Sequence, residues 1–390
     1  MFLKMLFSIT AALSVTLLGH YYLYLRIIYP IFGKNPFWIS TFICLWAMTF
    51  FGFIILRLVP HFLRKIFETI MFIWMGTAFI FTVICILTSP LSVYLNYNNY
   101  SSKFLSFFVL ALGLILTLFS IYQALKKPTV IKTEIPIRNN LPEIINELKF
   151  VVLSDIHVSG LIGRKKMRHL TEQVNSLKPD IIFITGDLMD GSLNQLKKEI
   201  APLENLYAKH GIFYITGNHE YYSGPINWKK HFLEKFKWKV ISNSSCSIEI
   251  ESLNLNIIGI EDRHWLSYEK IPRKLDKRLH QAVMHLEQKG FKTENALNIL
   301  LAHQPKDARL IPQFPFIDIQ ISGHTHGGQI WPLNYLVKKD QKYVKGLYRL
   351  NDQQQIYVNQ GTGFWGPPMR LGTECEISLL TFKQQKYIKP

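Results

Sequence analysis

The chain has 390 residues, 48% of them hydrophobic and 18% charged, and a formal net charge of +17. This length admits about two or three domains and leaves enough apolar material for a large core. No basic arm, helix-turn-helix or base-stacking signature accompanies the charge, which argues against nucleic acid as a partner and favours anionic membrane lipids or phosphate-containing substrates.

The first third of the chain predicts four transmembrane helices. Largely uncharged stretches cover residues 5–27, 35–56, 69–97 and 104–125, each long enough to cross a hydrocarbon core of about 20 residues. The first stretch could instead be a cleaved signal peptide, but it has no persuasive small-x-small cleavage site, its apolar core is long, and three more spans follow it. A transporter is disfavoured because the spans at 35–56 and 104–125 contain no ionisable group.

The charges that flank these spans predict their orientation. Seven basic residues lie on the side that holds both termini and three on the other, so the positive-inside rule predicts a multi-pass protein of the inner (cell) membrane with its C-terminal part in the cytoplasm. The two sets are Lys4, Arg57, Arg64, Lys65, Lys126, Lys127 and Lys132 against Arg26, Lys34 and Lys103. The cysteines Cys44, Cys85, Cys246 and Cys375 form no C-x-x-C pair, which supports neither a disulfide framework nor a cysteine zinc site.

The remainder predicts an α/β domain. We expect the transmembrane region at 1–126, a proline-containing linker with a first edge strand at 127–147, and the domain at 148–390. Strands alternating with helices, then strands in closer succession, predict a four-layer αββα sandwich of two sheets with helices outside. The apolar runs typical of buried strands are 149–153, 181–184, 212–215, 255–260, 297–302, 317–321, 356–359 and 377–382, and helical periodicity occupies 165–177, 193–210, 228–236 and 276–289.

Polar side chains follow five of these strands. Side chains at the carboxyl ends of neighbouring strands converge on one crevice in α/β sheets, and Gly186, Gly217 and Gly323 would let the backbone turn there without a Cβ in the way. Any one of these polar residues could be a simple turn former, but turn chemistry alone does not explain the repetition. The segments "VVLSDIH", "FITGDLMD", "YITGNHE", "LLAHQP" and "ISGHTHGG" supply Asp155, His157, Asp187, Asn218, His219, His303, His324 and His326.

These residue types predict a metal centre. Carboxylate, amide and imidazole donors without thiolate suit Mn, Fe or Zn rather than Ca. The donors are too numerous for one tetrahedral ion, so we expect two divalent metal ions that share a carboxylate. Such a pair can hold phosphate oxygens and provide hydroxide at neutral pH. No G-x-S-x-G elbow, H-E-x-x-H helix or P-loop is present, which sets other hydrolase templates aside.

The order D-x-H, G-D, G-N-H-E, H, G-H-x-H resembles the calcineurin-like metallophosphoesterase superfamily over residues 147–383. The resemblance implies that His219 is catalytic and assists the leaving oxygen. We expect Glu220 and Gln304, which border the site, to orient loops or ligands. The resemblance also implies that Asp187 bridges the two metals. It assigns Asp155, His157, Asp187 and His326 to the first metal, and Asn218, His303 and His324 to the second.

The C-terminal segment "GTGFWGPPMRLGTECEI" looks like the membrane-anchored subgroup similar to the bacterial enzymes YkuE and YaeI. Arg370 and Glu376 match that subgroup, whereas Cys375 replaces its usual proline. The resemblance implies hydrolysis of a phosphodiester or pyrophosphate bond, with a lipid-linked substrate such as UDP-2,3-diacylglucosamine as one possibility. The alternatives are a phosphatase or phosphodiesterase acting on a soluble substrate, and a non-catalytic membrane sensor of phosphorylated ligands.

Two further segments admit a membrane-related reading. The run 331–336 could receive acyl chains or could be a core-facing strand and turn. The segment 228–239 could be a basic helix on the membrane surface, although a domain helix that buries its apolar stripe is the preferred interpretation.

Overall fold

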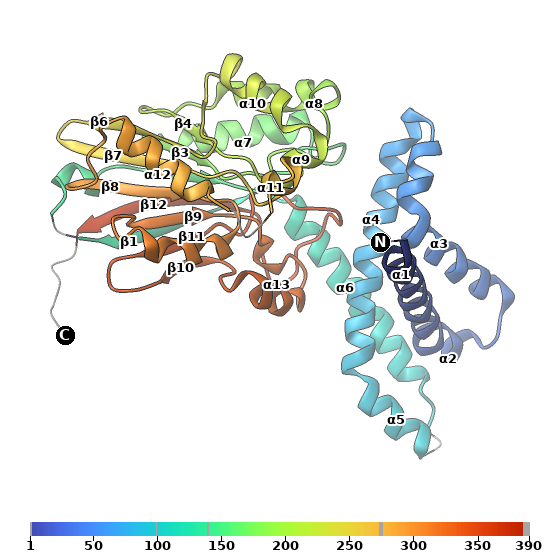
Figure 1. The fold of residues 1–390 in the computed structure, drawn as a ribbon. Coiled ribbons are helices and arrows are strands. Elements are labelled where there is room, and N and C mark those ends of the chain that lie inside the picture. Colours follow the sequence, from blue (N-terminus) through green and yellow to red (C-terminus); the bar gives the residue numbers. More distant parts are fainter. Residues whose placement is uncertain (1, 99, 139, 273–275, 385–390) are drawn as a thin grey trace. The chain divides into compact units, whose positions relative to one another are not determined.

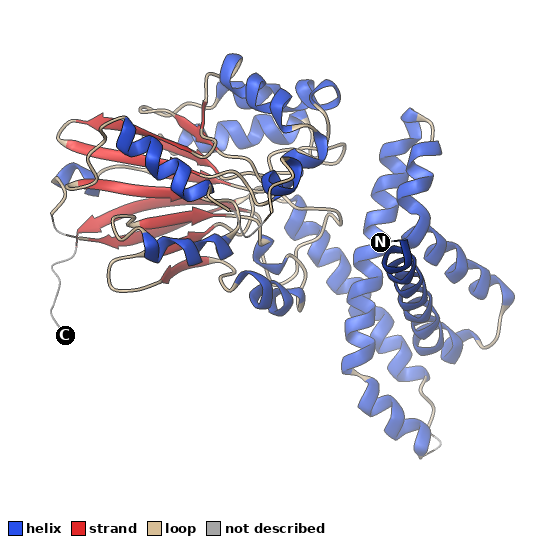
Figure 2. Cartoon of the chain, in the orientation of Figure 1, coloured by secondary structure: helices blue, strands red, loops and turns tan. Residues whose placement is uncertain are grey.

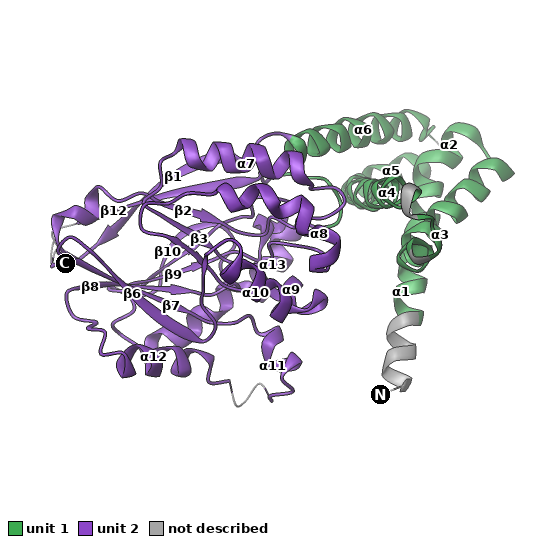
Figure 3. Ribbon diagram, turned by 90° about the horizontal axis from the view of Figure 1, so that it is seen from above, with its two compact units in different colours: residues 1–125, 366–371 green, residues 126–365, 372–390 purple. Residues whose placement is uncertain are grey.

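The computed structural model describes residues 2–98, 100–138, 140–272 and 276–384. The chain divides into two compact units, coloured separately in Figure 3. The first unit is Met1–Leu125 with Gly366–Leu371, and the second is Lys126–Trp365 with Gly372–Pro390.

Helices make up the first unit (Figure 1), and four of them are long and apolar enough to cross a membrane: Thr10–Phe32, Pro36–Leu56, Leu63–Leu87 and Lys103–Leu125. The four expected apolar helices are therefore confirmed. The third differs from its expected bounds of 69–97, because its helix ends at Leu87 and a separate helix follows. Pro90 causes this break, since it has no N–H to continue the helical bonding. The elements are α1 (Phe2–Leu23), a π-helical turn (Tyr24–Ile28), α2 (Tyr29–Phe32), α3 (Pro36–Leu58), α4 (His61–Leu87), α5 (Ser89–Tyr97) and α6 (Lys103–Leu125).

A buried histidine joins three helices of this unit. His20 of α1 uses its Nδ1 to donate to the Thr16 carbonyl at 2.8 Å. Its Nε2 accepts from the Trp74 indole of α4 at 3.0 Å and lies 3.4 Å from the Thr49 hydroxyl of α3. Because both ring nitrogens have partners, the imidazole is held in one neutral tautomer and crosslinks the helices.

Two six-stranded sheets stack face to face in the second unit, with α7 outside the first sheet and α12 outside the second (Figures 2 and 3). This confirms the two-sheet sandwich expected from the alternation of elements. The first sheet has the order β1 (Thr129–Ile137), β12 (Glu376–Gln384), β2 (Phe150–Leu153), β3 (Ile181–Ile184), β4 (Ile212–Tyr214), β5 (Lys239–Val240). The second has the order β10 (Gly346–Arg349), β11 (Gln355–Val358), β9 (Ile319–Ser322), β8 (Ala296–Leu301), β7 (Leu253–Gly259), β6 (Ser244–Ile250). The helices are α7 (Arg164–Ser176), α8 (Leu193–Ile200), α9 (Asn218–Ser223), α10 (Pro225–Glu234), α11 (His264–Tyr268), α12 (Arg278–Gln288) and α13 (Leu333–Gln341).

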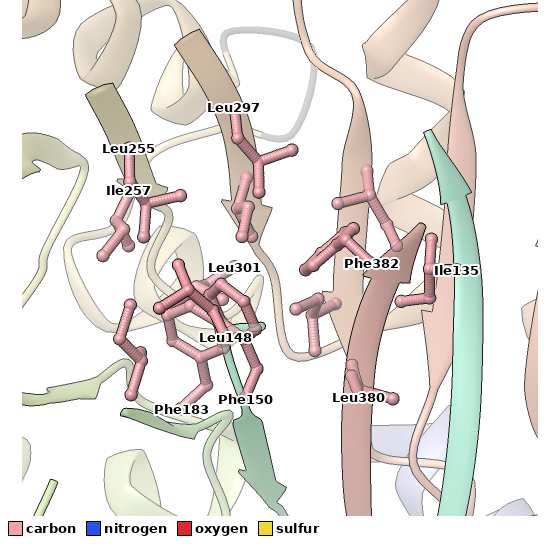
Figure 4. Packing of buried hydrophobic residues seen from close by; sticks show 14 of the residues in the cluster. Ile135, Leu148, Phe150, Phe183, Leu255, Ile257, Leu297, Leu301, Leu380 and Phe382 are labelled. Atoms are coloured by element: carbon pink, nitrogen blue, oxygen red, sulfur yellow. The ribbon is translucent and has the colours of Figure 1, made fainter. Parts of the chain in front are cut away.

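The core lies between the two sheets, where Phe150 and Phe183 of one sheet meet Leu255 and Leu297 of the other (Figure 4). The alternate side chains of the second sheet, such as Ile258, point the other way and pack against α12. Each central strand therefore buries both of its faces, which explains why the strands read as unbroken apolar runs.

Residues 127–147 hold β1, which confirms the expected edge strand and pairs in parallel with β12 from Thr129↔Glu376 to Ile137↔Gln384. Other elements depart from the expectations. The helix expected over 193–210 ends at Ile200 because Pro202 begins a 3-10 turn. Strand β6 was not expected at all.

The two membrane-related segments are both helical. Trp228 and Phe232 of α10 are fully buried, which confirms the preferred interpretation of a domain helix and shows that the alternative of a basic membrane-surface helix is wrong. Residues 333–341 form helix α13, so the core-facing strand considered for 331–336 is wrong as well. The exposed side chains of α13 become relevant to the proposed function.

Candidate metal centre

The five polar loops meet at the carboxyl ends of β2, β3, β4, β8 and β9, as the strand order predicts. Three overlapping groups have ligand atoms within 4.8 Å of one another. His157 belongs to the first two groups and Asp187 to the last two, so the three form one continuous centre. The groups are Asp155–His157–His326, His157–Asp187–His219 and Asp187–His303–His324, and Asn218 contacts His303.

Left-handed backbone turns aim these side chains. Five of the eight predicted site residues have φ between 50° and 70°, a conformation that costs non-glycine residues about 1–3 kcal/mol each. Hydrogen bonds between loops hold the turns in place, including Asp155 N–H to Gly186 O at 3.0 Å and His157 N–H to Asp187 O at 3.1 Å. Such clustered strain is characteristic of functional sites. The five residues are Asp155, His157, Asp187, His324 and His326.

Two glycines allow the loops to approach each other. A Cβ on Gly217 would collide with the Asp187 carboxylate, and a Cβ on Gly323 would collide with the Ser154 hydroxyl. A sharp backbone turn was the expected reason for small residues here. The structure shows that Gly217 and Gly323 also make room for the neighbouring loop.

The first donor set brings two imidazoles together. His157 Nδ1 donates to Asp190 at 2.8 Å, which leaves Nε2 with a lone pair. That Nε2 lies 3.0 Å from His326 Nε2, and the latter lies 3.5 Å from Asp155 Oδ1. Acceptor atoms this close repel one another unless a positive charge lies among them. The donor chemistry therefore fits a divalent metal ion.

The second donor set repeats this arrangement around His303. Its Nδ1 donates to the Thr185 carbonyl at 2.7 Å, so its Nε2 is again the acceptor. That atom lies 3.2 Å from Asn218 Oδ1, 3.2 Å from His324 Nδ1 and 3.3 Å from Asp187 Oδ2. Four donor atoms from four loops thus converge, and they fit a second cation.

Perturbed pKa values accompany this geometry. Burial would raise the pKa of Asp187, but the imidazoles of His303, His219 and His157 hold it well below its ordinary value. Burial raises the pKa of Asp155 above its ordinary value. Burial would lower the pKa of His157, yet Asp190 and the other carboxylates raise it to about 9. Such coupled shifts are typical of functional sites.

Asp190 is a functional residue to which the sequence analysis assigned no role. Its Oδ1 accepts hydrogen bonds from His157 Nδ1 at 2.8 Å and from His219 Nδ1 at 2.7 Å. Burial would raise the pKa of Asp190, but these two rings lower it to about 2. The only sequence signal was a carboxylate three residues after Asp187 in the same polar loop. The Asp190 carboxylate therefore orients the imidazole rings of both His157 and His219.

His219 stands between the donor sets and the surface. Its backbone N–H donates to Asp187 Oδ1 at 2.8 Å, and its Nε2 lies 4.0 Å from Asp187 Oδ2. Burial would lower the pKa of its imidazole, but Asp190 and Asp187 raise it above the ordinary value. The ring is thus held with Nε2 facing the centre.

Glu220 and Gln304 support the loops. The buried Glu220 carboxylate accepts from the backbone N–H groups of Asp187 at 3.1 Å, Leu188 at 2.7 Å and Gly217 at 2.6 Å. Burial raises its pKa to about 7. Gln304 donates to Asp262 Oδ2 at 2.7 Å. These contacts are of the orienting kind expected for both residues.

The two subgroup-matching residues belong to different units. Glu376 is buried in β12, where it accepts from the Tyr357 hydroxyl at 2.7 Å. Arg370 is in the short 366–371 segment of the first unit. Cys375 is buried and contacts the Gly363 carbonyl at 3.3 Å.

A two-sheet sandwich that gathers Asp, Asn and His donors for two cations at its strand ends is the architecture of metal-dependent phosphoesterases. The family model described as calcineurin-like phosphoesterase matches residues 148–328. A metallophosphoesterase of Campylobacter jejuni is 37% identical over 283 residues, 72% of this chain and 70% of that protein. The chain belongs to the calcineurin-like metallophosphoesterase family.

Two other relatives concern the candidate membrane-spanning helices and the expected resemblance to YkuE. A transmembrane protein with metallophosphoesterase domain from Danio rerio is 34% identical over 276 residues, 69% of this chain and 61% of that protein. The metallophosphoesterase YkuE of Bacillus subtilis is 29% identical over 278 residues, 67% of this chain and 89% of that protein. The chain spans less than two thirds of the length of several curated relatives it matches.

Proposed function

We propose that this protein is a membrane-anchored, metal-dependent hydrolase that cleaves a phosphodiester or pyrophosphate bond in a lipid-linked substrate such as UDP-2,3-diacylglucosamine. The observation that carries the proposal is the pair of donor sets that meet at Asp187, with His219 beside them. A phosphoester held between two cations is the substrate that suits such a site.

Asp155, His157, Asp187 and His326 would hold one ion, and Asp187, Asn218, His303 and His324 the other. Divalent ions held there supply positive charge for the phosphate oxygens and a nucleophile from water at neutral pH. The hydrogen bonds from His157 to Asp190 and from His303 to Thr185 place a proton on Nδ1 and aim Nε2 inward, where a bound cation would take the place of a second proton.

His219 would serve the leaving group. Asp190 accepts a hydrogen bond from His219 Nδ1–H and favours positive charge on the ring, so that Nε2 can donate a proton to the departing oxygen. The backbone bond from His219 to Asp187 fixes where this nitrogen lies. Asp190 acts through the two imidazoles, which makes it a positioning residue.

An exposed apolar surface adjoins the ligand loop. Helix α13 follows the loop of His326. Trp331, just before this helix, and Tyr335 and Leu336 within it have exposed fractions of 41%, 63% and 65%. Lys338 and Lys339 follow on the same helix, as is common where a helix meets an anionic lipid surface. With four candidate spans in the chain, this surface supports a lipid substrate, and the basic flanks favour placing the domain in the cytoplasm.

The experiment uses the full chain, purified in detergent and loaded with Mn, with UDP-2,3-diacylglucosamine and a water-soluble phosphodiester as substrates. We expect release of UMP from the lipid. The double change Trp331→Ser and Leu336→Ser should raise KM about tenfold or more for the lipid alone, since each buried apolar side chain contributes about 1.5–3 kcal/mol. The control is Tyr207→Ser, because Tyr207 is exposed at 69%, similar to Leu336, but lies in the segment before β4 and not in or beside α13. Equal losses on both substrates would refute the lipid assignment, and binding without turnover would favour a sensor.

A further inference from the structure

Exposed aromatic rings flank His219. The Tyr222 ring lies 5.2 Å from the His219 ring, centroid to centroid, at an interplanar angle of 70°, and Trp365 lies 5.8 Å away at 74°. His264 continues the series, 5.4 Å from Tyr222. Tyr222 is 65% exposed and Trp365 is 54% exposed. Large aromatic side chains left this open beside a buried centre leave substantial surface for a ligand.

The backbone of Trp365 is anchored on both sides of its side chain. Its main-chain N–H donates to Gln329 Oε1 at 3.0 Å, and Gln329 Nε2 donates back to its main-chain carbonyl at 2.7 Å. Gln329 lies just beyond His326, so a ligand loop carries the anchor. Rigid aromatic surfaces bind a ligand without a large loss of conformational entropy.

Tyr222 is anchored from the other side of the centre. Its hydroxyl lies 3.2 Å from His264 Nε2, and His264 Nδ1 donates to Asp262 Oδ1 at 2.8 Å. Buried Asp262 also accepts from Gln304, the residue after His303. This chain of contacts connects the exposed ring to the second donor set.

The chemistry of the surface selects its occupant. Both rings meet His219 near the perpendicular, which leaves area on each ring open to another flat ring. The Tyr222 hydroxyl and the His264 imidazole border it with hydrogen-bonding groups. A nucleobase offers a π face and a polar edge, whereas an acyl chain offers neither.

We infer that Tyr222 and Trp365, with His264 behind them, form a subsite for a planar heteroaromatic group carried by the substrate, such as the base of a nucleoside phosphate ester. The inference rests on the proposed function, because it requires the phosphate to lie at the metal centre on the His219 side. It makes the two aromatic residues determinants of specificity.

The test compares uridine 5′-monophosphate with ribose 5-phosphate, which carry phosphate on the same 5′ oxygen and differ only in the base. Both are used as competitive inhibitors of bis(p-nitrophenyl) phosphate hydrolysis by the Mn-loaded full chain in detergent. We expect the nucleotide to bind about 5- to 150-fold more tightly, the range given by about 1–3 kcal/mol for the stacking of one base. Trp365→Leu and Tyr222→Leu should each reduce this ratio, and Trp365→Phe should retain most of it.

An inhibition ratio near one in the wild-type protein, or a ratio unchanged in both leucine variants, would overturn the inference. An unchanged ratio with weaker binding of the variants to anionic vesicles would instead assign the rings to the membrane surface. If no ester is hydrolysed, the proposed function fails, and the same ratio is then read from equilibrium dialysis in the presence of Mn. The two failures are therefore distinguishable.

Discussion

Asp190 accepts hydrogen bonds from two imidazoles, so the substitution Asp190→Asn disturbs metal binding and catalysis together. The amide oxygen can take the place of Oδ1, which accepts both bonds, but the negative charge is lost and the two bonds are no longer charge-assisted. Each charge-assisted bond contributes about 1.5–3 kcal/mol. The loss of a residue that orients a metal-ligating histidine typically lowers metal affinity about 10- to 100-fold.

His219 gives the second consequence of this change. Without the negative charge of Asp190, the protonated form of the His219 ring is less favoured, and proton transfer contributes about 10²- to 10⁴-fold to rate. We therefore expect kcat to fall at least about 100-fold and to stay low even when excess Mn restores occupancy. The assay is kcat at rising Mn concentration, together with metal content per chain.

The matched control for this prediction is Asp352→Asn, which makes the same chemical change at a side chain that is 95% exposed. It should leave both quantities unchanged. An Asp190→Asn protein with wild-type turnover, or one fully rescued by Mn, would refute the reasoning.

Four other changes test the centre. Asp187→Asn should lose most metal and most activity, since both donor sets use this carboxylate; retained Mn in elemental analysis would count against it. His219→Ala should keep its metal but turn over about 10²-fold or more slowly, and loss of metal would make His219 a ligand instead. Gly217→Ala should destabilise the domain by about 1–3 kcal/mol through its clash with Asp187, which a lowered Tm would reveal. Mn at about 100 times its Kd should raise the free energy of unfolding by about 2.7 kcal/mol in the wild-type protein and not in Asp187→Asn, so an equal rise in Tm for both would show that the ions bind elsewhere.

Local sequence was enough to locate the donors. Asp155, Asp187 and His303 each follow an unbroken apolar run, and parallel strands in neighbouring positions bring their carboxyl ends together. The sequence pattern thus combined the apolar run of a buried strand with a metal-ligating residue at its end. The structure brings all eight predicted residues to one centre, whereas their individual roles stay predictions.

Asp190 shows what the sequence could not reveal. Its two partners lie 33 residues before it and 29 after it, and they meet only because left-handed turns at His157 and Asp187 aim the side chains. Residue periodicity holds no information about such turns. The short bridge between Val158 and Met189, which aligns the two loops, is likewise visible only after folding.

Two amphipathic segments left alternatives open. The lysines between Trp228 and Phe236 are compatible with a membrane-surface helix, yet the aromatic stripe is buried in the domain, as the preferred interpretation predicted. The run from Trp331 to Leu336 is apolar enough for a core strand, but it is partly helical and exposed. In both cases the tertiary environment decided which face of the same pattern met solvent.

The parallel pairing of β1 with β12 determines where the polypeptide can be cut. β1 begins four residues after α6 ends and covers β12 along nine residues. A fragment that starts at residue 148 would strip this edge and leave the backbone of the C-terminal strand open to self-association. A water-soluble version of the catalytic half for crystallisation should therefore begin near Lys127 and retain the chain through Gln384.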